Sequence, residues 1–203
     1  MKMSRFFLIM FAVMLTALSP CSAQISLQLD TEYGSILQFE EINASLTIRN
    51  NASSPLIIDP HNKDANAVLA FAVERRRYED VDAVDDAPSI PRIVVPPGEE
   101  KKLTVDLSLW YSLVEMRRYI IKAELEWKGH DYRSNPVMIN IVRGRELLRK
   151  ASTVPGYEDE IRIVTLKYWV RKQGGHLFLC FDDEDEDVNY GVFPLGPVIR
   201  VRK

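Results

Sequence analysis

Polar and apolar residues alternate with a period of two along most of the chain, and this pattern constrains the fold more than any other feature of the sequence. Residues 42–49 show it most clearly, since apolar residues at the even positions alternate with Asn, Ser, Thr and Arg at the odd positions. Successive side chains of a β-strand point to opposite faces, so such a segment has one face in a core and one in water. No long segment has the period of an amphipathic helix.

Similar segments recur along the chain, with turn-forming residues between them. Residues 119–127 form the longest of them, Val-Pro-Pro-Gly-Glu at 95–99 is a turn, and residues 78–91 predict a long polar loop. Many short strands at this spacing predict a mainly β fold, an antiparallel Ig-like β-sandwich over residues 24–142. The strands expected in this part are 25–29, 42–49, 56–58, 69–73, 93–95, 103–107, 119–127 and 137–141.

This order of strands and turns resembles immunoglobulin-like and fibronectin-type-III-like sandwiches. The likeness rests on Asn-Asn-Ala-Ser-Ser-Pro-Leu at 50–56, on the turn at 95–99 and on the strand opened by Tyr119. Leu113 precedes Tyr119 at a spacing similar to that of the tyrosine corner, in which the phenol hydroxyl bonds backbone. The Pro-Gly of that corner and the paired cysteines of antibody domains are missing. The resemblance therefore implies an architecture and no particular activity.

A second resemblance is to a family of bacterial β-sandwich proteinase inhibitors. It rests on Asn-Ala-Ser-Ser-Pro-Leu at 51–56, which is similar to the Asn-x-Ser-x-x-Pro-Leu that ends a strand in that family, on a later Pro-Gly-Glu, and on the Phe-x-Val segment at 71–73. The aromatic run that this family has next is replaced here by Glu-Arg-Arg-Arg-Tyr. The resemblance implies an exposed loop that occupies a protease cleft, for which residues 78–92 and 110–118 are the candidates.

The alternation stops after residue 142. We expect residues 143–160 to be a linker, with two turns of helix at 145–151. Beyond it we predict a small C-terminal β-hairpin extension over residues 161–203, which packs on the sandwich because so short a piece has too little core of its own. The strands expected in this extension are 161–170, 176–181, 190–193 and 198–201.

Residues 1–23 have the parts of a secretory signal peptide: a positively charged start, an apolar run too short to span a bilayer, and small residues before a cleavage point at Gln24. An alternative is cleavage before Cys21 and acylation of that cysteine, which would anchor the protein to a membrane. We predict a secreted or periplasmic protein. Cys180 is the second of its two cysteines, so removal of the leader leaves no intrachain disulfide.

A search for catalytic residues yields no candidate set. The histidines His61 and His130 lie beside acids in expected turns, where such pairs are common, and the glycine, cysteine and histidine motifs of known active sites are absent from the sequence. Cys180 alternates with Phe178 in an apolar strand, which indicates a buried and unreactive thiol. We therefore predict that the protein is not an enzyme and has no cofactor.

The acidic run at 182–187 is the most unusual segment. Asp183, Asp185, Asp187 and Asn189 have the alternating oxygen spacing of calcium loops, but Val188 stands where such a loop needs glycine. A solvated turn that protects a sheet edge is the better interpretation, so we assign no metal site.

The remaining clusters receive similar interpretations. The arginines at 75–77 and 117–118 could bind an anionic partner, but we expect them to be solvated or paired within the chain with the acidic loop at 79–86. Trp110, Trp127 and Tyr132 could form a sugar-binding face, but the register of Trp127 places it in the core.

The charge balance narrows the class of partner. The formal net charge of −3, without a basic cluster large enough to hold a phosphate backbone, argues against nucleic acid. No segment beyond the leader is apolar for the length of a membrane span. The sequence thus predicts an exported, non-catalytic binding or structural module that acts on a protein or glycan partner through sandwich loops. The alternative is a secreted proteinase inhibitor of the β-sandwich type.

Overall fold

A computed structural model of the chain describes residues 24–62, 65–75, 79–154, 156–172, 174–184 and 188–198. Over these residues the protein is mainly β, and its helical structure is one 3₁₀ turn, η1 (Leu107–Leu109). The predicted leader, residues 1–23, lies outside the described residues, and Cys21 with it. Among the described residues no helix is long and apolar enough to cross a membrane.

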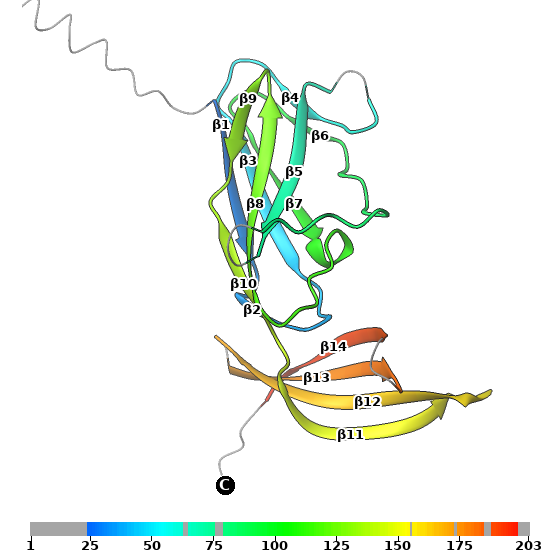
Figure 1. Ribbon diagram of the computed structural model, residues 1–203. Helices are drawn as coiled ribbons and strands as arrows, with labels where there is room; N and C mark the ends of the chain where they lie inside the picture. Colours follow the sequence, from blue (N-terminus) through cyan, green and yellow to red (C-terminus); the bar gives the residue numbers. More distant parts are fainter. Residues whose placement is uncertain are drawn as a thin grey trace, which may run out of the picture.

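Two sheets pack face to face in the N-terminal part (Figure 1). The three-stranded sheet has the order β1 (Ile25–Thr31), β3 (Asn43–Asn50) and β7 (Glu100–Asp106), all antiparallel. The larger sheet has the order β2 (Ser35–Leu37), β10 (Val137–Val142), β8 (Arg118–Trp127), β5 (Ala67–Glu74), β4 (Leu56–Ile58) and β6 (Ile93–Val95), and β9 (His130–Arg133) pairs with the free part of β8.

The core lies between these two sheets, and it is built from the residues that the alternation placed on one face. In β3 the side chains of Ala44, Leu46 and Ile48 are fully buried, whereas the residues between them are half-buried or exposed. Strand β8 buries Tyr119 and Trp127 in the same way, which confirms the core position predicted for Trp127. The expected β-sandwich-like class is therefore observed.

Tyr119 behaves as the tyrosine-corner resemblance implied. Its ring is fully buried, and its hydroxyl donates to the carbonyl of Glu115, four residues upstream, at 3.4 Å. Leu113 is buried in the same core. Burial is the largest cause that raises the pKa of the Tyr119 hydroxyl above its ordinary value.

The strands expected for residues 24–142 are all present, and two short ones were not expected. Strand β9 begins directly after a two-residue turn whose central residues, Lys128 and Gly129, have φ of 52° and 73°. Two left-handed residues in succession form the turn that matches the twist of a hairpin, and Gly129 adopts this conformation without strain. Strand β2 pairs with β10 in parallel.

The C-terminal part is a four-stranded antiparallel sheet in sequence order: β11 (Arg145–Val154), β12 (Tyr157–Arg171), β13 (Gly174–Asp183) and β14 (Asn189–Pro197). The helix predicted at 145–151 is wrong, and the segment expected as a linker forms β11 and the first part of β12. The physical reason is pairing, since β11 is bonded in register to β12 from Arg145 onward. Such pairing outweighs a weak local helix propensity.

A buried ion pair connects this sheet to the sandwich. Arg171 of β12 donates to the carboxylate of Glu40, and both side chains are almost completely buried. The Arg171 guanidinium also lies over the rings of Tyr33 at 3.7 Å and Phe178 at 4.8 Å. Glu40 accepts a second hydrogen bond, from the Leu37 backbone N–H at 3.0 Å. The ion pair with Glu40 and the stacking of Arg171 on Tyr33 therefore hold the two parts together.

Candidate functional site

The larger sheet is interrupted beside β5, and this gap is the candidate site. Among the described residues, β4 pairs with β5 at one register position, Ile58 with Ala67. The Asn66 side chain extends this short contact, because its amide donates to the carbonyl of Pro55 and accepts from the N–H of Ile57.

Beyond Ile58 the chain leaves β5 in a tight turn. The Asn62 N–H bonds the Asp59 carbonyl, and the Asp59 carboxylate accepts from the N–H of His61. Asp followed by Pro favours such a turn, because Asp bonds its own backbone two residues on and Pro presets its φ. Pro60 also lacks the N–H that a continuing strand would need. The sequence itself therefore ends the pairing of β4 with β5.

The other end of β5 is covered by the long loop that follows it. The N–H of Val81 bonds the Val73 carbonyl, and the N–H of Arg75 bonds the Glu79 carbonyl. The hydroxyl of Tyr111 donates to the Phe71 carbonyl. Among the described residues, the edge of β5 is thus occupied from Phe71 onward and near Ala67, and it is open between them.

The backbone of Leu69 faces this opening. The N–H and C=O of Ala123 in β8 are both bonded to Ser134, so they point away from β5. Ala123 is the register partner of Phe71, so the backbone groups of Phe71 point to the outer edge of β5, as the bond from Tyr111 shows. Because this direction alternates along a strand, the N–H and C=O of Leu69 point to the same edge.

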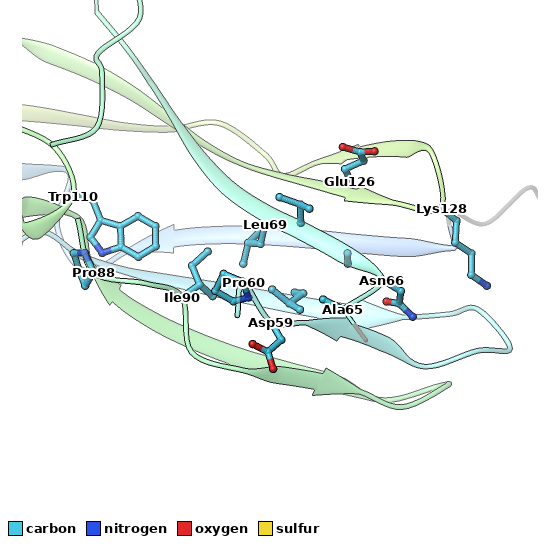
Figure 2. A pocket seen from close by; sticks show the side chains of 13 residues that line it. Asp59, Pro60, Ala65, Asn66, Leu69, Pro88, Ile90, Trp110, Glu126 and Lys128 are labelled. Atoms are coloured by element: carbon cyan, nitrogen blue, oxygen red, sulfur yellow. The ribbon is translucent and has the colours of Figure 1, made fainter. Parts of the chain in front are cut away.

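The gap is a groove of about 520 Å³, within the usual size of a ligand pocket. Figure 2 shows Trp110 and Pro88 at one end, Leu69, Ile90 and Pro60 in the middle, and Asn66 and Lys128 at the other end. Trp110 is half-buried and packs edge-on against Phe71 with ring centroids 5.5 Å apart. One end of the groove is therefore apolar and rigidly placed.

The polar end of the groove carries both signs of charge. Asp59 forms an ion pair with Arg92 at 3.5 Å. Lys128 donates to the Ser54 hydroxyl at 2.7 Å and lies over the ring of Trp127 at 4.4 Å. Glu126 lines the same end (Figure 2). Because the acids Asp59 and Glu126 are balanced by Lys128 and Arg92, the groove has polar groups here without a strong net charge.

A second hollow, of about 840 Å³, lies between the sandwich and the C-terminal sheet. It is larger, but the Arg171 and Glu40 side chains that line it are bonded to each other. His176 lines it as well, with its ring nitrogen Nδ1 3.1 Å from the Gly174 carbonyl. The contacts at this hollow serve the junction, so we place the candidate site at β5.

The structure does not assemble the histidines into a catalytic site. His61 lies in the turn after β4 and His130 at the start of β9, both exposed, and neither lines the groove at β5. Cys180 is fully buried, and desolvation raises the pKa of its thiol, in agreement with the core position expected for it. Across the described residues no cluster of three or more His, Cys, Asp or Glu is arranged to hold a metal ion.

The acidic run is only partly described, because residues 185–187 lie outside the described ranges. The described oxygens are used in the turn: Asp183 accepts from the N–H of Val188, and Asp182 accepts from the side chain of Asn189. Of the basic runs, Arg76 and Arg77 are likewise outside the described residues.

The described arginines of these runs have partners within the chain, although the acid is Glu115 and does not belong to the loop at 79–86. Arg75 and Arg117 both pair with Glu115, and Arg118 donates to the side chain of Asn140 at 3.3 Å. The described arginines of the basic runs are therefore engaged within the chain.

The sequence analysis did not find the groove at β5. It named the loops 78–92 and 110–118, which do border the site: Ile90 lies on one wall and Trp110 at one end. The residues that line the groove are ordinary Ile, Leu, Pro and Trp. The one signal for the site in the sequence was the Asp-Pro after the short strand at 56–58. What makes them a site is that no strand of the described residues pairs with the outer edge of β5 at Leu69, which no local pattern shows.

Comparisons with known proteins give little further guidance. No protein family matches the chain, and no curated protein matches its sequence. Among solved structures, one similar chain is Spo0M, a sporulation control protein from Bacillus subtilis, with 12% sequence identity and a TM-score of 0.36. That match covers 85% of this chain and 91% of the other. No immunoglobulin-like or fibronectin-like family is identified, and nothing about function follows from a likeness at this level.

Proposed function

We propose that the protein is an exported, non-catalytic binding module that holds an extended segment of a partner protein in the groove at β5. The observation that carries this proposal is the open edge of β5 at Leu69, flanked by apolar walls. A guest strand can bond there to the N–H and C=O of Leu69 and to the N–H of Phe71. Such strand addition obtains affinity from backbone hydrogen bonds and specificity from pockets for alternate side chains.

The groove determines the chemistry of the guest. Trp110, Pro88 and Ile90 surround its apolar end, so the guest needs an aliphatic or aromatic side chain there. Asn66 and Lys128 at the other end favour a polar residue. A glycan is a poorer fit, because Trp110 is the single aromatic side chain among the described residues that line the groove, and the rest of the apolar lining is aliphatic.

The inhibitor alternative has less support. Val81 and Ile90 of the loop 78–92 are buried in the sandwich core, and the N–H of Val84 bonds the Trp110 carbonyl. In the loop 110–118, Tyr111 and Leu113 are buried as well. Both loops are thus held against the sandwich, which suits the walls of a groove better than a segment that enters a protease cleft.

Amide hydrogen exchange tests the open edge without any ligand. We expect the amide of Leu69 to exchange much faster than those of Val68 and Ala70, which point toward β8. Adding a blocked peptide of sequence Lys-Val-Thr-Val-Thr-Val-Lys should shift the amide resonances of Leu69 and Phe71 and slow their exchange. A Leu69 amide as protected as its neighbours would contradict the proposal.

Backbone methylation of the same peptide tests the binding mode. Peptides N-methylated at odd or at even positions differ only in which edge loses its N–H groups. Strand addition predicts that one set abolishes binding and the other leaves it nearly intact. Equal binding of both sets would rule out pairing with β5.

A matched pair of variants places the peptide in the groove. Pro88→Arg puts a charge at the apolar end and should weaken peptide binding at least about tenfold, roughly 1.4 kcal/mol. Pro97→Arg is the control, because Pro97 is equally exposed in the turn before β7 and does not line the groove. An equal effect of the two substitutions would place the peptide elsewhere.

Export is tested on the protein isolated from its own host. A mature chain that begins at Gln24 agrees with a secreted or periplasmic module. An acylated N-terminal Cys21 would make it a membrane-anchored lipoprotein, and an intact Met1 in the cytoplasm would contradict export.

A further inference from the structure

The hollow between the sandwich and the C-terminal sheet contains polar groups that the contact between these two parts does not use. This junction hollow has a volume of about 840 Å³, which is within the usual size of a ligand pocket. The sandwich borders it with the turn after β1 and with residues 39–43, and the C-terminal sheet borders it with Arg171, His176 and β14. Arg171 and Glu40 form an ion pair there, so their charges offset each other.

Two further carboxylates, those of Glu32 and Glu41, line the junction hollow. Both residues are exposed, and neither carboxylate has an ion-pair partner among the described residues. A hydrogen bond to Glu32 is the largest cause that raises the pKa of the Tyr33 hydroxyl above its ordinary value, so this carboxylate lies against the ring that borders the hollow. Because Arg171 is the one Lys or Arg among the described lining residues, the junction hollow has an excess of negative charge.

His176 adds an independent feature, an acceptor without a partner. The residue is 9% exposed, and its ring nitrogen Nδ1 lies 3.1 Å from the carbonyl oxygen of Gly174. Because a carbonyl oxygen can only accept, Nδ1 carries the proton, and Nε2 of the neutral ring is an acceptor. Nε2 has no hydrogen-bond partner among the described residues, and it is not one of the polar atoms that the protein encloses completely. It therefore faces the junction hollow, which His176 lines.

The aromatic walls of the junction hollow already hold cations of this chain. The Arg171 guanidinium lies 3.7 Å from the centre of the Tyr33 ring, and that of Arg162 lies 4.1 Å from the centre of the Tyr190 ring. Such cations are attracted to the negative face of an aromatic ring. Phe39 lines the same hollow, is 38% exposed, and has no ring or cation contact among the described residues. It therefore offers an aromatic surface that the described part of the chain leaves unused.

These features favour an organic cation over a metal ion or a guest strand. Glu32, Glu41 and His176 are not arranged to hold a metal ion. Strand β14 has its open edge at this hollow, but Pro194 and Pro197 lack the N–H groups that pairing with a guest strand needs. What remains is a set of acceptors and carboxylates beside aromatic and aliphatic walls. That set matches a ligand with N–H donors, a positive charge and an apolar part.

We propose that the junction hollow is a second binding site and takes an organic cation, an ammonium or guanidinium group on an apolar stem. Glu32 and Glu41 offset its charge, Nε2 of His176 accepts from one of its N–H groups, and Phe39 packs against its stem. Hydrogen bonds in which one group is ionised are about twice as strong as those between neutral groups. Free amines and the Lys or Arg side chains of a partner protein share this chemistry, so probes of both kinds are needed.

Titration calorimetry of the purified protein with matched cationic and neutral probes provides the first test. Phenylethylamine and phenylethanol differ in charge, and the blocked peptide Gly-Arg-Gly differs in the same way from its citrulline counterpart. We expect at least one cation to bind about tenfold or more tightly than its neutral counterpart at low salt, and the ratio to fall as the salt concentration rises. The cation that binds more tightly, amine or peptide, identifies the source of the ligand.

Two double variants with equal loss of charge test the position of the cation. Glu32→Gln/Glu41→Gln should weaken binding at least about tenfold. Glu99→Gln/Glu100→Gln is the control and should change binding less than about twofold, because exposed charges far from a site are screened by salt. Both of its residues are exposed, and Asn43, which lines the hollow, pairs with Asp106 at the opposite end of β7, roughly 20 Å from Glu100.

Nitrogen-15 NMR of the His176 ring tests the hydrogen bond. At pH 8 the Nε2 resonance should shift when the tighter cation is added and stay unchanged with its neutral counterpart. The Nδ1 resonance should move little, since its bond to Gly174 persists.

Three results would overturn the proposal. Equal binding of the cations and their neutral counterparts would exclude a cation site. Equal losses in the two double variants would mean that the net charge of the protein attracts the probe and that the junction hollow does not hold it. An Nε2 resonance that does not respond to a cation that binds would place that cation elsewhere.

Discussion

The sandwich and the C-terminal sheet are both antiparallel β-structure, yet they bury their strands differently. Strand β3 of the sandwich has one buried face and one that is polar and more exposed, and β8 repeats this pattern. Strand β13 of the C-terminal sheet buries His176, Phe178, Cys180 and Asp182 toward the sandwich while its other face carries Leu177, Leu179 and Phe181. The first part is a closed unit of two sheets. The second is a single sheet that has one covered face and one uncovered face.

The difference shows that the alternation in a strand separates two faces, and that a second layer decides which of them is buried. In the sandwich, the apolar positions of each strand lie on its inner face, because the opposite sheet covers that face. In the C-terminal sheet the covered face mixes apolar Phe178 and Cys180 with polar groups such as Arg171, which makes the junction with Glu40. The three predictions that follow break or sharpen this contrast, from the largest expected effect to the smallest.

The largest effect is expected in the sandwich core. Leu46→Ala removes a fully buried side chain from the central strand β3 and should lower the free energy of unfolding by about 3–5 kcal/mol. Leu147→Ala on β11, where the leucine is 50% exposed, should change it by less than about 0.5 kcal/mol. Urea denaturation measures both. Similar losses would mean that the two regions do not differ in packing as described.

An intermediate effect is expected at the junction. Arg171→Ala leaves the buried carboxylate of Glu40 with the Leu37 N–H as its remaining partner and should destabilise the protein by about 2–3 kcal/mol. The double variant Arg171→Met/Glu40→Gln should lose less, because it leaves no unpaired charge.

Thermal unfolding followed by calorimetry measures this pair of variants. We expect the Arg171→Ala transition to broaden or split, since the C-terminal sheet then unfolds apart from the sandwich. A double variant that is less stable than the single one would contradict the role of the ion pair.

The smallest effect concerns the tyrosine at the edge of β5. Burial raises the pKa of the Tyr111 hydroxyl above its ordinary value of 10.0, so the folded protein retains a proton that the unfolded chain releases. This contribution to stability is fully present below about pH 10 and is lost as the pH rises further.

Tyr111→Phe should flatten the decline in stability above about pH 10, with the contributions of Tyr119 and Cys180 remaining. At neutral pH the loss of its hydrogen bond to the Phe71 carbonyl should cost about 1 kcal/mol. Urea titrations between pH 8 and pH 11 measure both effects. If the free energy of unfolding declined more steeply with pH in the variant than in the wild type, this would contradict the raised pKa and the burial of the Tyr111 hydroxyl.

Much of the fold could be predicted from sequence, for reasons that particular residues make clear. Residues 42–49 and 119–127 alternate cleanly, and each has one covered face, so their strands were found. Residues 145–154 were predicted as helix and linker because Leu147 and Leu148 break the alternation, and β11 bulges at this point. Strand β9 was missed because Lys128 and Gly129 form so tight a turn that its return strand looks like part of it.

The candidate site could not be predicted, because it depends on an edge of β5 that has no pairing strand among the described residues. Asp59-Pro60 in the sequence ends one strand. Whether the space beside Leu69 then stays open depends on where the loop 79–92 and Trp110 lie.

The order of polar and apolar residues was sufficient to specify a mainly β chain, the position of its core strands and the burial of Trp127 and Cys180. These properties follow from local chemistry, since the period of the side chains decides which of them can leave water together. The packing of distant segments specified the rest: the edge of β5 that the described residues leave open at Leu69, and the Arg171–Glu40 junction. Each depends on whether another part of the molecule lies beside a given strand, and a period-two pattern carries no information about the neighbours of the strand that it describes.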